Sequence, residues 1–164
     1  MNLIESLQID VPRMTSDTTC IAKMNLNEFH KQPQGYLNGG ATLAFAEIIA
    51  GMMSNELVGS HKFGVGQSIT ANHLRPVTCE GTLTALGILL VKGKTSHVWR
   101  FDMIDDAQRL ISQVTVTLSL IHISALIMDN VLYAYAGCGV VADSDADEEY
   151  AETNNKMRTI LDAL

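Results

Sequence analysis

An apolar segment near the middle of the chain constrains the fold most. Between Ala41 and Val58, large hydrophobic side chains would lie on almost every side of a helix, and Glu47 is the first charge to interrupt them. A helix of this kind is buried on most sides and needs other elements to enclose it. Asn38 or Gly39 would supply the N-cap. The segment therefore predicts a long central helix inside a covering layer.

Strand-like patterns occur on both sides of this helix. One precedes it, and four follow it, at 19–26, 66–74, 81–91, 95–104 and 110–121. The last four are separated by short breaks, which predict antiparallel neighbours in a four-strand meander. A sheet wrapped around one buried helix satisfies the hydrophobic surfaces of both. The expected fold class is α+β, with an antiparallel sheet around the helix and a short helix at 3–7.

Composition excludes several classes of function. The formal net charge of −7 argues against a nucleic-acid partner, because nucleic acid attracts basic surfaces. The three cysteines are too scattered for a metal motif, and their odd number suits no disulfide framework. No basic-then-apolar leader and no run long enough to span a bilayer are evident. We expect a cytoplasmic protein with neither a bound metal nor a membrane partner.

The chain changes character near residue 122. From Asp129 onward there are eight acids and two bases, a net charge of −6, whereas residues 1–128 carry −1. We expect one domain over 1–122 and an acidic extension over 123–164 that cannot build a core of its own. Within the extension, 143–163 has the pattern of a helix, with Ser144 as a candidate cap.

The start of the central helix carries the parts of a catalytic site. A glycine pair, Gly39 and Gly40, leaves backbone N–H groups free to face a ligand at the positive end of the helix. The carboxylate of Glu47 follows on an apolar helix. Burial of this charge would be unfavourable, which suggests that the residue has a function there. Backbone donors and a desolvated carboxylate are the two components needed to hydrolyse an acyl group.

Spacing predicts where that site lies. Gly39 and Glu47 are eight residues apart, about 12 Å along a helix, so one carbonyl carbon cannot touch both. Two antiparallel copies of the helix, side by side in a dimer, would bring Gly39 of one chain near Glu47 of the other. We therefore expect the site at a subunit interface.

Several motifs occur together in one order. They are QPQGYLNGGATLAFAE at 32–47, NHLRPV at 72–77, and Gly93-Lys94-Thr95 leading into Val98-Trp99. With the order of elements, they resemble the hotdog-fold acyl-CoA thioesterases over residues 10–121, in the branch that acts on 4-hydroxybenzoyl-CoA and 1,4-dihydroxy-2-naphthoyl-CoA. The resemblance implies an aromatic acyl-CoA substrate, no cofactor beyond the coenzyme A of the substrate, and a homodimer or a dimer of dimers.

The resemblance also assigns roles to residues. Glu47 matches the catalytic carboxylate, acting as nucleophile or as general base on water. Gly39 matches the glycine whose N–H binds the thioester oxygen, and Gln32 a glutamine that orients substrate or water. Substrate and coenzyme A contacts would come from residues that match Gly40, His73, Arg75, Gly93 and Lys94.

Two positions depart from the family pattern. Asn38 stands where relatives commonly have a histidine, and it cannot titrate near neutral pH. Gly51, four residues after Glu47, stands where relatives often have serine or threonine. Both changes leave Glu47, Gly39 and Gln32 in place, so we expect activity with altered efficiency or specificity.

The extension resembles a different family. The segment YAGCGVVADSDADEEYAETNNK, at 135–156, is similar to the C-terminal signature of chorismate-utilising enzymes such as isochorismate synthase. There, acids matching Glu149 and Glu152 help to hold Mg²⁺ and substrate. The fragment lacks the large domain of such an enzyme, so we expect no isochorismate synthase activity. It is a contextual indication of menaquinone synthesis.

Other interpretations of these residues remain open. Glu47 and Gln32 can be structural, and the chain can be a non-catalytic hotdog module that binds an acyl-CoA or a partner. A hotdog dehydratase fits less well, because its histidine chemistry has no counterpart in the loop before the helix. The remaining histidines share no metal spacing and are expected to be structural or exposed: His30, His61, His97 and His122.

Overall fold

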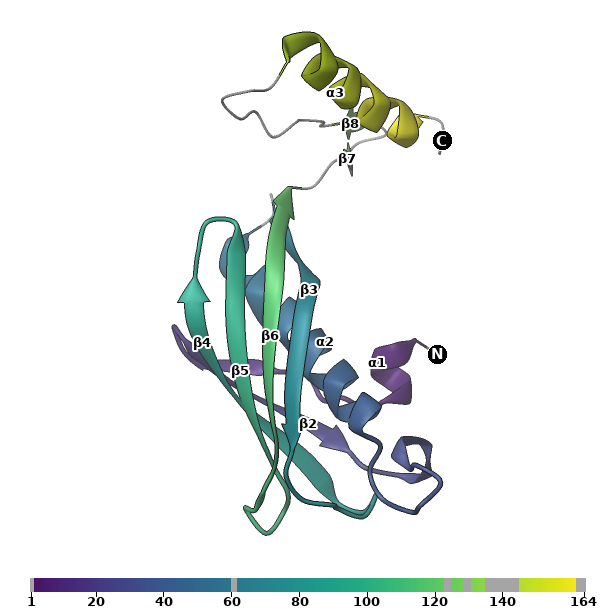
Figure 1. Cartoon of the computed structure of the whole chain (residues 1–164), viewed down its shortest axis with the longest axis vertical. Coiled ribbons are helices and arrows are strands. Elements are labelled where there is room, and N and C mark those ends of the chain that lie inside the picture. Colours follow the sequence, from purple (N-terminus) through teal and green to yellow (C-terminus); the bar gives the residue numbers. More distant parts are fainter. Residues whose placement is uncertain (1, 60–61, 123–124, 129–130, 135–144, 162–164) are drawn as a thin grey trace. The chain divides into compact units, whose positions relative to one another are not determined.

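The computed structural model describes residues 2–59, 62–122, 125–128, 131–134 and 145–161 of the chain (Figure 1). It divides into two compact units, Met1–Ile121 and His122–Leu164. The first unit holds the helices α1 (Leu3–Ser6), η1 (Glu28–His30, a 3-10 turn) and α2 (Gly39–Val58). Its strands are β1 (Arg13–Ser16), β2 (Thr19–Asn25), β3 (Lys62–His73), β4 (Thr82–Lys92), β5 (Ser96–Ile104) and β6 (Leu110–His122).

The strands form one six-stranded sheet in the order β1-β2-β4-β5-β6-β3, which curves around α2 (Figure 1). The predicted fold class is confirmed, but the predicted four-strand meander is wrong. Of the four strands predicted to form it, β4, β5 and β6 pair in chain order, whereas β3 lies at the far edge, beside β6. The strand β1 was not predicted.

The connection after β3 explains this order. Leu37 N–H donates to the Val77 carbonyl at 2.9 Å, and Tyr36 bridges to Thr78. Leu26, just beyond β2, donates its N–H to Gly81 at 2.9 Å. These bonds hold the segment after β3 beside the start of α2 and the end of β2. As a result, β4 begins next to β2 and pairs with it. The break is therefore a crossover rather than a tight turn.

Local sequence sets the ends of α2. Asn38 is the N-cap, and its side-chain oxygen accepts from Gly40 N–H at 2.8 Å. Gly59, with φ +72°, ends the helix in a conformation that favours glycine. The buried residues follow a single helical stripe: Thr42, Phe45, Ala46, Ile49, Ala50, Met53 and Ser54. The expectation of burial on most sides is therefore wrong within one protomer, because Leu43, Ile48 and Met52 remain half-buried.

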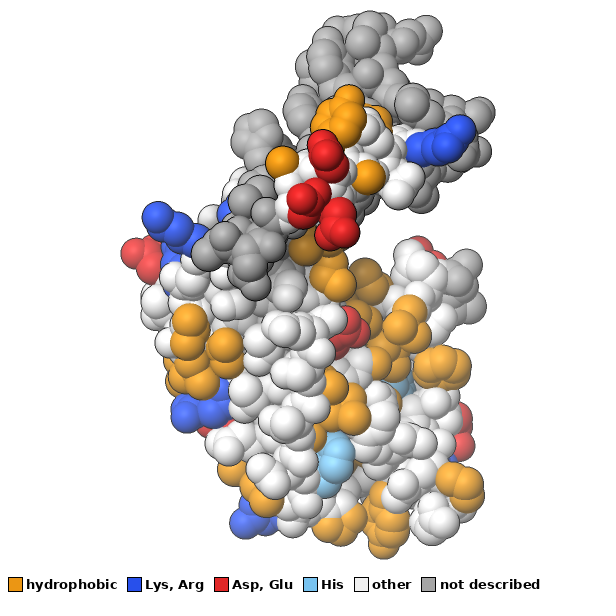
Figure 2. Space-filling view, turned by 45° about the horizontal axis from the view of Figure 1, so that its top comes forward, with side chains coloured by type: hydrophobic (Ala, Val, Ile, Leu, Met, Phe, Trp, Pro, Cys, Tyr) orange, Lys and Arg blue, Asp and Glu red, His pale blue; other side chains and the backbone are white. Residues whose placement is uncertain are grey.

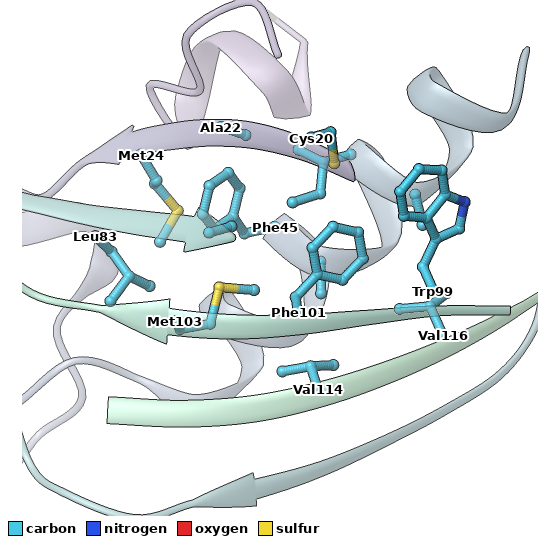
Figure 3. Packing of buried hydrophobic residues seen from close by; sticks show 14 of the residues in the cluster. Cys20, Ala22, Met24, Phe45, Leu83, Trp99, Phe101, Met103, Val114 and Val116 are labelled. Carbon is cyan, nitrogen blue, oxygen red and sulfur yellow. The ribbon is translucent and has the colours of Figure 1, made fainter. Parts of the chain in front are cut away.

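By length and composition alone, α2 would qualify as a membrane-spanning helix, contrary to the expectation from sequence. Its buried stripe instead packs on the sheet, as in the core helix of a folded domain. Phe45 from α2 meets Phe101 and Met103 from β5 (Figure 3). Trp99 and Phe101 stack with ring centroids 5.9 Å apart. Burial of each such side chain contributes about 1.5–3 kcal/mol.

A buried polar cluster also holds α2 to the sheet. Ser54 Oγ lies 2.9 Å from Nε1 of Trp99 and 2.9 Å from Nδ1 of His97, both on β5. The indole can only donate, so the Ser54 hydroxyl accepts from Trp99 and is free to donate to His97. His97 is thereby structural, as expected from sequence, and His30 is likewise buried in a hydrogen bond to Leu7 O at 3.0 Å.

Ser54→Ala is expected to destabilise the protein by about 1–3 kcal/mol for each group that it leaves unsatisfied. Those groups are the Trp99 indole N–H and Nδ1 of His97. Urea unfolding followed by tryptophan fluorescence measures the loss. Ser119→Ala, a half-buried serine with one longer bond to Gln67, is the control and is expected to cost much less. Equal losses from both variants would contradict the role of the cluster.

Stability is expected to fall below about pH 6.5, the ordinary value for histidine. Burial, together with the charge of Lys92, lowers the pKa of His97 below that value. The unfolded chain therefore takes up the proton first, so acid favours unfolding and the full contribution is present above pH 6.5. Urea unfolding at pH 8 and at pH 5.5 measures the change. His97→Gln should flatten the profile, and an unchanged slope in that variant would refute the assignment.

The second unit contains a hairpin of β7 (Ala125–Met128) and β8 (Val131–Ala134), followed by α3 (Ala146–Leu161). Leu126 pairs with Tyr133 across the hairpin. Acidic side chains are exposed near the start of α3 (Figure 2), as predicted for an acidic helix. The candidate cap Ser144 and the glycines of the chorismate-like signature lie outside the described residues. That 123–164 is not an independent domain stays a prediction.

Candidate active site

The loop before α2 is built to hold Gln32. Gly35 N–H donates to the Gln32 carbonyl at 2.9 Å, and Gln32 N–H donates to the Tyr36 carbonyl at 2.8 Å. Gly35 has φ +88°, so glycine suits this turn. Asn38 N–H then donates to the His30 carbonyl at 2.8 Å and leads into the helix. These bonds fix the backbone of Gln32 near the positive end of α2.

A pocket of about 270 Å³ lies at this end of the helix. Four of the predicted site residues line it: Gln32, Gly39, His73 and Arg75. We call it the glycine pocket. Its other lining residues include Tyr36, Thr42 and Ser112. Arg75 is tied to the sheet through a hydrogen bond from Nη1 to Leu110 O at 2.6 Å, and its guanidinium charge is suited to an anionic ligand.

His73 lies directly against Gly39. Its Nδ1 is 2.9 Å from Oγ of the buried Ser112. A Cβ on Gly39 would come within 2.7 Å of Nε2, closer than side chains ever approach. Glycine is therefore required at position 39 for the ring to reach the helix start. The resemblance placed His73 along the coenzyme A arm, whereas the structure places it beside the candidate oxyanion donor.

Glu47 lines a second pocket of about 240 Å³, which we call the carboxylate pocket. Its other lining residues are Leu43, Ala44, Gly66, Gln67, Ser68 and Ile69. The carboxylate lies against Gly66 of β3, where a Cβ would collide with Oε1. Glu47 is exposed in the single protomer, so the expected desolvation of this carboxylate is not present within one chain.

The two pockets share no lining residue. Gly39 contributes to one and Glu47 to the other, in keeping with their separation along α2. One protomer therefore holds the two predicted catalytic residues, Gly39 and Glu47, in separate pockets.

Some predicted residues lie away from both pockets. Gly93 and Lys94 form the β4–β5 turn, where Gly93 N–H donates to Ser96 O at 2.9 Å. Gly40 lines neither pocket, and the side-chain oxygen of Asn38 is engaged in capping. Within the described part of the chain, no group of three metal-ligating side chains comes together.

Sequence reasoning missed Gly66, Thr42 and Ser112. A glycine inside a strand often marks close approach by another group, so a signal for Gly66 was present. The sequence holds no such signal for Thr42 and Ser112. Each is a single hydroxyl residue in a helix or strand, and only the fold determines which residues lie next to it.

Comparison with known proteins finds matches to two families along the chain. Residues 34–112 match the family described as the thioesterase superfamily, and residues 122–164 match the family described as chorismate binding enzyme. A protein of Bacillus subtilis with the name "Putative esterase ComA2" is 36% identical over 73% of this chain and 94% of its own length.

Two further comparisons cover the same region. The 1,4-dihydroxy-2-naphthoyl-CoA hydrolase of Escherichia coli is 30% identical over 64% of this chain and 76% of its length. The crystal structure of yhdA from Lactococcus lactis superposes with a TM-score of 0.72 and 48% identity, over 74% of this chain and 98% of that one.

Proposed function

Because the chain belongs to the thioesterase superfamily and is a thioester hydrolase, we propose that it hydrolyses an aromatic acyl-CoA to the free acid and coenzyme A. The division of the site into two half-sites on one helix carries this proposal. Within one chain, Gly39 N–H and the Glu47 carboxylate are too far apart to reach the same carbonyl group. A site shared between two chains explains why the helix carries both.

A dimer would complete the site. The side of α2 next to β3 carries Leu43 and Ala44, both half-buried. The adjacent strand β3 is an edge of the sheet, so one side of its backbone is unpaired within the protomer. An edge strand and an apolar helix face together form a surface that soluble proteins usually cover. Antiparallel pairing there would bring Gly39 of one protomer to Glu47 of its partner and desolvate that carboxylate.

A second apolar surface supports a dimer of dimers. Leu86, Ile88 and Leu90 of β4 are 37–50% exposed on the face of the sheet opposite α2. Nearby on β5, Nε of Arg100 is buried without a hydrogen-bond partner, 3.9 Å from the Asp102 carboxylate. A second dimer packed on this face would cover these three apolar side chains and supply an acceptor for Arg100.

The reaction then follows from the two half-sites. Gly39 N–H, at the positive end of α2, stabilises the oxyanion that forms on the thioester oxygen; one such donor contributes about 3–4 kcal/mol. Glu47 of the partner either takes a proton from water, which adds to the acyl carbon, or attacks that carbon itself to form an anhydride that water opens. In both routes the C–S bond breaks and coenzyme A leaves as the thiolate, which takes up a proton.

The remaining residues have supporting roles in this proposal. Gln32 orients the water or the thioester. Arg75, in the glycine pocket, binds a phosphate of coenzyme A, and Lys94 and Gly93 meet its nucleotide at the β4–β5 turn. No cofactor beyond the coenzyme A of the substrate is required. Buried free thiols at Cys20 and Cys79 suit a reducing compartment, which we take to be the cytoplasm.

The proposed acyl group is 1,4-dihydroxy-2-naphthoyl. The name of the Escherichia coli relative supports it, and so does the chorismate-binding match of residues 122–164, because both point to menaquinone synthesis. The competing proposal is a non-catalytic module that binds acyl-CoA, which the departures at Asn38 and Gly51 favour.

Thiol release from three substrates separates the two proposals. The full chain should hydrolyse 1,4-dihydroxy-2-naphthoyl-CoA with a higher kcat/KM than benzoyl-CoA or hexanoyl-CoA, and a chain ending at residue 122 should do the same. Binding of coenzyme A with no thiol release from any substrate would establish the module instead. Faster hydrolysis of hexanoyl-CoA would overturn the aromatic assignment.

A further inference from the structure

His30 is a buried histidine for which the proposed reaction has no use. The residue is only 1% exposed, and it lines neither the glycine pocket nor the carboxylate pocket. Both ring nitrogens nevertheless have backbone partners. Nδ1 lies 3.0 Å from Asn27 N, and Nε2 lies 3.0 Å from Leu7 O. A buried polar ring with two such partners connects parts of the chain that are distant in sequence.

These two contacts fix where the ring carries its proton. A backbone N–H can only donate, so Nδ1 accepts from Asn27 and the proton is on Nε2. Nε2 then donates to the Leu7 carbonyl. Nδ1 is also 3.3 Å from the Asn27 carbonyl, but a bond there would need the proton on Nδ1 and would leave Nε2 and Leu7 O both as acceptors. The ring therefore uses one acceptor and one donor.

The ring joins the N-terminal segment to the residues before α2. Leu7 is the C-cap of α1 and belongs to the hydrophobic core cluster. Asn27 is the N-cap of η1, the turn that contains His30. The backbone carbonyl of His30 accepts separately from Asn38 N–H, at 2.8 Å. A side-chain substitution at position 30 would keep that backbone bond and remove only the link to Leu7 or to Asn27.

The loop at 31–38 is held to the rest of the protein near both of its ends. Near its far end, Leu37 N–H donates to the Val77 carbonyl at 2.9 Å. Near its first residue, the side-chain anchor is the ring of His30. Gln32 lies between these anchors, two residues after His30, and lines the glycine pocket. A shift of the near anchor would therefore move Gln32 within that pocket.

We propose that His30 is a positioning residue, which holds Gln32 in place for the reaction through its bond to Leu7. This inference rests on the proposed thioesterase function. Misplacement of an orienting group by about 1 Å can cost about 10²-fold in rate, so the effect is expected in kcat. Affinity for coenzyme A should be unaffected, because Arg75 is tied to β6 independently of the loop.

Two variants of the full chain distinguish the bond to Leu7 from the bond to Asn27. The amide nitrogen of His30→Gln extends about as far as Nε2 and can still donate to Leu7 O. His30→Asn can still accept from Asn27 N–H but is too short to reach Leu7. Thiol release from the best acyl-CoA substrate should show near-parental kcat for His30→Gln and a loss of up to about 10²-fold for His30→Asn. Affinity for coenzyme A should stay within about threefold of the parent value in both.

His97→Gln is the matched control for loss of a buried histidine. His97 is also 1% exposed and lines neither pocket. Its replacement should lower the melting temperature but leave kcat unchanged at a temperature where the variant is folded. A double variant adds a test that a purely structural role would not pass. In a Gln32→Ala background, His30→Asn should cost far less in kcat than it costs in the parent.

Each other outcome has a definite meaning. Parental kcat in His30→Asn, or losses that add to those of Gln32→Ala, would overturn the positioning role. Equal losses in His30→Gln and His30→Asn would show that the bond to Leu7 is not the anchor. If neither variant folds, as measured by circular dichroism, the residue is structural and the inference is wrong. If the parent itself releases no thiol from any acyl-CoA, the proposed function fails, and the inference fails with it.

Discussion

Glu47→Gln is expected to lower kcat for thioester hydrolysis by about 10²–10⁴-fold, the usual contribution of a positioned acid or base. The amide keeps the shape of the side chain against Gly66 but can neither accept a proton from water nor attack a carbonyl. Steady-state thiol release with the best acyl-CoA substrate measures the loss. Since the substitution leaves Arg75 and the glycine pocket unchanged, affinity for coenzyme A should stay within about threefold of the parent value.

Glu56→Gln is the matched control. Glu56 is an exposed carboxylate on the same helix and lines neither pocket. Its replacement should leave kcat unchanged and should shift the net charge by the same amount. If both variants lost activity equally, or if Glu47→Gln retained more than about a tenth of the parental kcat, the catalytic role of Glu47 would be refuted.

Gly39→Ala is expected to reduce kcat by up to about 10²–10³-fold, the loss that follows removal of one oxyanion donor. The added methyl group cannot be accommodated next to Nε2 of His73, so the ring or the first turn of α2 has to shift. Either shift moves the N–H away from the thioester oxygen. Kinetics with the same substrate measure the loss, and circular dichroism verifies that the helix content is retained.

Gly40→Ala is the neighbouring control, because its Cβ would meet only Asn38 Oδ1, at 3.1 Å. Its loss should be much smaller. The double variant Gly39→Ala/His73→Ala then distinguishes a steric from an additive effect. If the collision with His73 causes the loss, removal of the ring in the Gly39→Ala background should cost far less than it costs in the parent. Additive losses would contradict the steric explanation.

The sequence predicted the elements that depend on local pattern. The long apolar helix, its start near Asn38, and the strands around it all follow from hydrophobic periodicity and from capping chemistry. Their observed bounds differ by a few residues from the expected ones, most at β3, which begins at Lys62 rather than at residue 66.

The position of β3 could not be predicted from connection lengths. A break at Arg75-Pro76 looked like a tight turn between neighbouring strands. The structure instead uses the residues after β3 as a crossover, held by backbone bonds from Leu37 and Leu26. Those bonds join segments about forty to fifty-five residues apart, and local propensity carries no information about such pairings.

The candidate site likewise has features that local sequence predicted and features that depend on the fold. Gln32, Gly39 and Glu47 were identified from motif and spacing, and the separation of Gly39 from Glu47 was predicted from helix geometry alone. The contact between His73 and Gly39 was not, because it depends on where β3 meets the start of α2. The exposure of Glu47 was also unexpected, since the sequence shows an apolar helix but not which of its faces the sheet covers.

Mixing two inactive variants tests the central claim, a site shared between two protomers. Glu47→Gln keeps a complete glycine pocket, and Gly39→Ala keeps a complete carboxylate pocket. In a two-fold dimer that contains one copy of each, one of the two sites combines both intact halves. After subunit exchange of equal amounts, activity should recover to about a quarter of the parental value, because about half of the dimers are mixed. If mixed dimers form, as shown by mass spectrometry, but activity stays at the level of the separate variants, the site does not lie between protomers.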